Sequence, residues 1–287
     1  MKKIAIIIIG FSFLLAGFSE VKAQDLKTEV YVKENIPQKK AVPYPYVREA
    51  DVMWSKIVWR MVDLREKMNM PLYYPTRPIG NRMSLMDLLL YGIDNEGLTA
   101  YDPNDPLNEF KIQMTKEQID MALDAGVDTI RTTDVNTGEL VTKIVPKERR
   151  TDEVKQILVK EKWYFDKTHS VMKVRIVGLS PIRMYYRPED IGNPDAPIQM
   201  RQTFWIYYPE ARNLLANHEI FNRHNDAQQI SFDDFFWQRR FNSYIFKESN
   251  VYNNRRIGEY SLGIESLYES ERIKEYIFNF EHDLWEY

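Results

Sequence analysis

This 287-residue chain contains no cysteine, so nucleophilic catalysis would need an activated serine, threonine or lysine. Its histidines and carboxylates are the other candidates for chemistry. His218 and His224 flank a glutamate, an arrangement similar to the metal-binding helix of zinc proteases. That motif needs its second histidine four residues after the first, so that both reach one metal from the same helical face. Asn222 occupies that position, and His224 comes two residues later. The spacing argues against a zinc site and favours histidines that lie on the surface or make structural hydrogen bonds.

Acidic residues offer two further candidates. Asp134–Gly138 is similar to the start of a calcium loop, but such a loop needs glycine at its sixth position and glutamate at its twelfth. Gly138 is fifth and Val145 is twelfth, so the segment is predicted to be a hairpin turn. The pair Asp233 and Asp234 could serve acid–base chemistry only in a cleft, and it is better explained as the cap of a predicted helix.

Neither a nucleotide-binding glycine loop nor a nucleophile elbow occurs in the sequence. We therefore expect no catalytic residue, no metal site and no cofactor, and a protein that is not an enzyme. The net charge is −3 and the arginine pairs are interleaved with acids, which is not the pattern of a nucleic-acid-binding protein. Aromatic residues make up 13% of the chain, eighteen of them tyrosines, and this favours a protein with large contact surfaces.

The first 23 residues have the pattern of a secretory signal peptide. Lys2 and Lys3 precede an apolar run over 4–15, and small residues at 21 and 23 mark a cleavage site. The run is too short to span a bilayer comfortably. A lipoprotein would need a cysteine directly after the signal, so we expect no direct membrane anchor. Any attachment of this exported chain to a membrane must therefore pass through a partner.

An extended N-terminal arm is predicted for residues 24–47. The segment is polar, contains prolines at 37, 43 and 45, and follows neither a helical nor a strand period. It is either a disordered terminus or an arm that becomes ordered on a neighbouring chain.

The segment 48–67 is predicted to be an amphipathic helix around which the domain is organised. On a helical wheel Met53, Ile57, Met61 and Leu64 share one arc, which should face the core.

Val52 and Trp59 project from the opposite side of that predicted helix. Another element of the same domain covers them, or they meet another protein chain. An exposed indole is a good interface anchor, so we name Val52 and Trp59 as candidate interface residues. On this hypothesis Trp59→Ala should fold but assemble poorly.

The rest of the chain predicts an α+β fold in a single mixed domain over 48–287, with antiparallel hairpins and packed helices. Helices are expected after the capping residues Ser84, Thr115 and Ser231 and after Pro209. Expected strands are 72–74, 129–135, 139–145, 157–165, 171–179, 202–208 and 244–246, with a terminal helix over 264–285.

The run from Pro45 to Tyr74, with Arg-Glu-Ala-Asp-Val-x-Trp-Ser-Lys at its centre, resembles the gliding-motility protein GldN family, also called PorN. Similar matches follow, in order, at 84–89, 163–167, 174–182, 204–209 and 232–253. The resemblance implies a periplasmic structural subunit of the type IX secretion system of Bacteroidetes. Its implied partners are further copies of itself and the lipoprotein GldK (PorK), with which it forms a ring beneath the outer membrane. The GldL–GldM motor complex, through the periplasmic region of GldM (PorM), is a further implied partner.

Two alternatives to a ring subunit stay open at this point. One is a periplasmic hydrolase or ligand-binding protein with no recognisable motif, and the other is a monomeric adaptor that never enters a ring. Mixing the chain with its lipoprotein partner and measuring particle size separates all three.

Overall fold

The computed structural model describes residues 36, 38–80, 82–104, 109–133, 140–190, 196–222, 225 and 227–284, with only the backbone of 127–133, 140–146 and 188. These residues belong to the compact unit Ile36–Tyr287. The predicted signal peptide 1–23, most of the arm before residue 38, the hairpin loop 134–138 and His224 lie outside the described residues.

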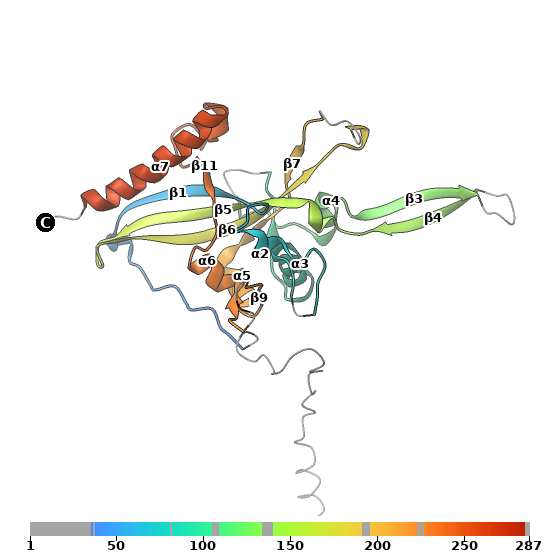
Figure 1. Cartoon of the computed structure of the whole chain (residues 1–287), viewed down its shortest axis with the longest axis horizontal. Coiled ribbons are helices and arrows are strands. Elements are labelled where there is room, and N and C mark those ends of the chain that lie inside the picture. The colour runs from blue at the N-terminus through green and yellow to red at the C-terminus, as the bar shows by residue number, and fades with distance from the viewer. Residues whose placement is uncertain are drawn as a thin grey trace, which may run out of the picture. The chain divides into compact units, whose positions relative to one another are not determined.

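A seven-stranded sheet, antiparallel throughout, is the centre of this unit (Figure 1). Three long strands carry it: β1 (Val52–Asp63), β5 (Val154–Asp166) and β6 (Val171–Tyr185). The order is β11-β1-β5-β6-β8-β2, and β7 also pairs with β6. The short strands are β2 (Ala100–Tyr101), β7 (Gln199–Gln202), β8 (Trp205–Tyr207) and β11 (Tyr244–Glu248).

Helices pack on this sheet, which confirms the predicted α+β class. The helices are α2 (Met70–Tyr73), α3 (Leu85–Asn95), α4 (Lys116–Ala122), α5 (Tyr208–Ala216), α6 (Phe232–Trp237) and α7 (Ile264–Asp283). Single 3₁₀ turns are η1 (Glu49–Asp51), η2 (Thr151–Glu153), η3 (Pro188–Asp190) and η4 (Ile257–Glu259). Two strand pairs lie outside the sheet: β3 (Gly126–Thr133) with β4 (Leu140–Lys147), and β9 (Glu219–Ile220) with β10 (Ile230–Ser231).

The main core joins α3, α5 and α6 to the sheet. Its fully buried side chains include Leu88, Leu89, Phe204, Leu215 and Phe232. A separate cluster lies under α7, where Ile273 and Ile277 pack with Val58 of β1 and Ile245 of β11. The ring of Phe280 stacks on Trp54 of β1, with centroids 4.9 Å apart. Helix α7 is therefore fixed to the sheet through one apolar face.

The predicted organising helix 48–67 is wrong, because this segment forms strand β1. It pairs with β5 along its whole length, from Val52 opposite Asp166 to Asp63 opposite Gln156. Residues spaced by four, such as Met53, Ile57 and Met61, recur on one face of a strand as well as on one arc of a helix. The spacing is therefore ambiguous, and the β-branched and aromatic residues of the segment favour the strand.

Local signals at helix starts are confirmed. Ser84 accepts a hydrogen bond from the backbone N–H of Asp87, and Thr115 and Ser231 each form a complete capping box. The predicted strand 72–74 is wrong, since Met70–Tyr73 is a short helix with Pro71 in its first turn. Proline at that position already has the helical φ, and its missing N–H costs nothing there.

The strand assignment makes a direct test possible with two residues of β1. Met53 belonged to the core of the predicted helix but is 66% exposed, whereas Val58 is fully buried. Val58→Ala should lower the free energy of unfolding by about 2 kcal/mol, because a buried side chain is lost. Met53→Ala should change it by less than about 0.5 kcal/mol. Denaturant unfolding of both variants checks this. A larger loss of stability in Met53→Ala than in Val58→Ala would instead support the predicted helix.

Candidate functional site

Trp59, the predicted interface anchor, is buried inside its own chain. Its side chain is only 2% exposed, and its indole Nε1 donates a hydrogen bond to Glu109 Oε1 at 3.0 Å. The ammonium groups of Lys160 and Lys247 lie 5.2 and 4.2 Å from the ring centroid. The premise of an exposed indole is wrong for Trp59, and another element of the same domain covers it. Val52, its predicted companion, is partly buried.

The carboxylate of Glu109 fixes a loop onto the sheet at this point. It forms an ion pair with Lys160 of β5, and Lys247 of β11 lies 4.0 Å away. Burial lowers the pKa of Lys247, although the charge of Glu109 opposes that effect. Glu109 therefore compensates two lysines that have little access to water. Its role is structural.

The other residues considered for chemistry also have structural partners. His218 Nδ1 lies 2.9 Å from the carbonyl oxygen of Leu214, and the ring of His169 is hydrogen-bonded to the carboxylate of Asp166. Asp233 accepts two 3.0 Å hydrogen bonds from Arg212 and one from the hydroxyl of Tyr208. Within the described residues, no group of three histidine or acidic side chains is placed to hold a metal ion.

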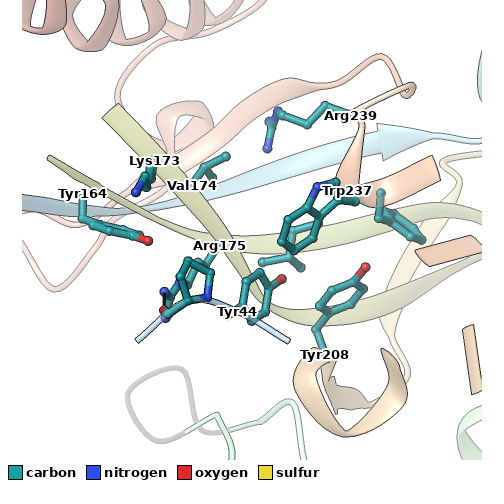
Figure 2. Close-up of a pocket in the computed structure, with 11 residues that line it drawn as sticks. Tyr44, Tyr164, Lys173, Val174, Arg175, Tyr208, Trp237 and Arg239 are labelled. Atoms are coloured by element: carbon teal, nitrogen blue, oxygen red, sulfur yellow. Dashed lines mark hydrogen bonds between the residues drawn. The ribbon is translucent and has the colours of Figure 1, made fainter. Parts of the chain in front are cut away.

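A cavity of about 270 Å³ beside strand β6 is a candidate binding site (Figure 2). Aromatic rings and cations make up most of its wall, and none of the described residues that line it is a histidine, a serine or an acid. Such a lining suits binding of an apolar group next to an anion and not acid–base catalysis. The rings are Tyr44, Tyr164, Tyr208, Phe236 and Trp237, and the cations are Lys173, Arg175 and Arg239.

The arm segment 38–46 forms one wall of this cavity. The ring of Tyr44 stacks on Trp237 at 5.2 Å between centroids, and the guanidinium of Arg212 lies 4.4 Å from the Tyr44 centroid. Lys39 forms an ion pair with Asp234. Burial is the main cause of a raised pKa at Tyr44. The hypothesis that the arm orders only on a neighbouring chain is therefore wrong for this segment, which is packed on its own domain.

The three cations of the cavity differ in their partners. Arg239 pairs with Glu161 at 2.8 Å, and Lys173 pairs with Asp166 at 2.6 Å. The hydrogen bond from Lys173 is the main reason that the pKa of Asp166 is lowered. Arg175 has no carboxylate partner among the described residues.

Arg175 is held in place by aromatic rings and one backbone group. It lies over Tyr44 and Tyr164, at 5.0 and 5.4 Å from their centroids, and donates to the carbonyl oxygen of Pro45. Sequence reasoning missed this residue as a candidate. The alternation over 171–179 places Lys173 and Arg175 on one face of a strand, but nothing local indicates that Tyr44 and Trp237 lie beside them.

A second cavity, of about 380 Å³, lies between strands β7, β8 and β11. Its wall mixes the acids Asp102 and Glu109 with the cations Arg201, Lys247 and Arg256. Because both signs of charge are present, its lining does not select one class of ligand.

Residues 47–286 match the family described as gliding motility associated protein GldN. The chain belongs to this family. Membership associates it with gliding motility and type IX secretion, and the family is a structural component of that machinery and not a known family of enzymes. No curated protein matches the chain. In the part of the chain that the structure describes, no helix is both long and apolar enough to cross a membrane.

Glu109 can be tested as the buried counter-charge of Trp59 and its lysines. Glu109→Gln should destabilise the chain by about 3 kcal/mol, because it leaves Lys160 and Lys247 buried without compensation. Glu275→Gln, a change at an exposed position of α7, should have almost no effect. Thermal or denaturant unfolding measures both. Equal stability of the two variants would mean that water already screens the lysines.

The arm segment 38–46 offers a matched pair of tyrosines. Tyr44→Ala should cost about 1–2 kcal/mol of stability, because it removes the stack on Trp237 and the contact with Arg212. Tyr46 is 89% exposed, so Tyr46→Ala should cost less than about 0.5 kcal/mol. The two unfolding curves give the answer, and coincident curves would show that the arm does not stabilise the domain.

Proposed function

We propose that this protein is a structural ring subunit of the type IX secretion and gliding machinery. In this proposal it is periplasmic and assembles with copies of itself and with the lipoprotein GldK (PorK) beneath the outer membrane. The periplasmic region of GldM (PorM), within the GldL–GldM motor complex, contacts the assembled ring. Family membership over residues 47–286 supports the association with this machinery.

An exposed apolar surface on α7 and the loop before it is the observation that carries the proposal. We call it the α7 surface. Helix α7 buries Ser270, Ile273 and Ile277, and its opposite side presents Ile264, Leu267 and Tyr268. Its members are each more than half exposed: Val251, Tyr252, Leu262, Ile264, Leu267, Tyr268 and Phe278. So many exposed apolar side chains in one stretch support the proposal that another protein covers this surface.

Charged residues border this surface and would set its partner's orientation. Arg255 lies between the rings of Tyr252 and Tyr260, at 4.7 and 4.4 Å from their centroids. Arg272 and Glu269 form an ion pair on the adjacent turn of α7. A rim of paired charges around apolar side chains is the usual composition of a protein interface.

Assembly with the lipoprotein tests the proposal. The mature chain is mixed with the soluble part of a GldK-like lipoprotein, and particle size is measured by light scattering and electron microscopy. We expect rings far larger than a one-to-one complex. A stoichiometric small complex would support an adaptor, and no association at all would contradict the proposal.

A surface variant connects that assay to the structure. Leu262→Glu combined with Ile264→Glu should abolish the large particles while leaving the unfolding midpoint unchanged, because charge is placed on an exposed apolar surface. Met121→Glu, at an exposed apolar residue of α4, serves as the control and should assemble normally. Normal assembly of the double variant would exclude the α7 surface from the ring contacts.

A further inference from the structure

One half of strand β6 has an open edge. Strand β6 pairs with β5 along one edge. Along its other edge it pairs with β8 at Gly178–Leu179 and with β7 at Ile182–Tyr185. On that side of residues 171–177 the described chain places no strand. The N–H of Met172 already donates to Glu281 Oε1 at 3.1 Å, so a further strand would pair with the backbone of residues 173–177.

The cavity beside β6 lies directly at this open edge. Successive side chains of a strand point to opposite faces, so Val174 and Ile176 belong to one face and Lys173 and Arg175 to the other. All four line the cavity, which therefore lies off the edge of the strand and reaches both faces (Figure 2). A strand added there would enter the cavity itself.

The two faces offer different chemistry to such a strand. Phe236 and Trp237 line the cavity together with Val174 and Ile176, and these apolar side chains suit an aromatic or branched aliphatic side chain. On the face of Arg175 the guanidinium lacks a carboxylate partner among the described residues. An acidic side chain there would supply the missing counter-charge.

We propose that the edge of β6 over residues 173–177 binds an extended segment of a partner protein by strand addition. The segment carries an aromatic or branched aliphatic side chain flanked by carboxylates. The apolar side chain enters the cavity next to Trp237, and the adjacent carboxylates, on the opposite face of the added strand, pair with Arg175. This site does not depend on the ring assembly proposed above.

The charges on the edge favour an acidic partner over a second copy of the same edge. Two copies of β6 paired antiparallel around Val174 would place Lys173 of each chain opposite Arg175 of the other. Like charges directly opposite each other destabilise a strand pair, and lysine on an edge strand is a common protection against self-pairing.

Peptide binding to the full mature chain tests the proposal. The probe is a fluorescent, end-blocked heptapeptide, Thr-Val-Glu-Phe-Glu-Val-Thr, whose binding is followed by fluorescence anisotropy. We expect saturable binding that weakens roughly tenfold when both glutamates become lysine, and as much with Arg175→Gln in the protein. Arg175→Lys should retain most of the affinity. Arg201→Gln, a change at an exposed arginine of β7, should bind like the original chain.

Main-chain pairing is tested with two N-methylated versions of the same peptide. Each carries methyl groups on one alternating set of amides, and only one set can face β6. One version should therefore lose binding while the other keeps it. Equal behaviour of the two versions, absence of saturable binding, or equal affinities of the Arg175→Gln and Arg201→Gln variants would each overturn the proposal. So would self-association of the chain that Arg175→Gln strengthens, since it would assign the edge to a second copy.

Discussion

A fully buried carboxylate in the middle of the sheet, Glu161, is the interaction on which the rest of the structure depends. Arg60 of β1 lies 3.1 Å from it, Arg239 pairs with it at 2.8 Å, and the indole of Trp163 donates to it at 2.9 Å. These contacts join two central strands to the segment that follows α6. Removing one partner of such a cluster leaves an uncompensated buried charge, so the cluster enforces one arrangement of these elements.

The same carboxylate explains the conformation after α6. Arg239 has a φ of 51°, a left-handed conformation that costs a residue with a side chain roughly 1 kcal/mol or more. Its ion pair with Glu161 offsets that cost and fixes the end of α6. Trp237, the last residue of α6, lines the cavity beside β6. A charge buried in the sheet thus determines the position of an aromatic ring at the surface.

Sequence reasoning was accurate where the determining contacts are local. Ser84, Thr115 and Ser231 each contact residues three positions away, so their caps can be identified from the order of residues alone. It failed at β1 because apolar residues spaced by four fit the period of a helix and the period of a strand. Only the pairing with β5, about a hundred residues later, decides between the two. Arg175 was missed for a similar reason, since its importance arises from Tyr44, far away in the chain.

The stacking of Tyr44 on Trp237 has a mechanical consequence. The arm segment 38–46 is attached through the Lys39–Asp234 ion pair, then through this stack, and then through the carbonyl of Pro45. A pulling force applied at the N-terminal end of the segment would load these contacts one after another, as in peeling. The wall of the cavity would open at a far lower force than is needed to shear β1 from β5, whose many hydrogen bonds share the load. Tension on the chain would thus be converted into loss of a binding cavity while the sheet remains intact.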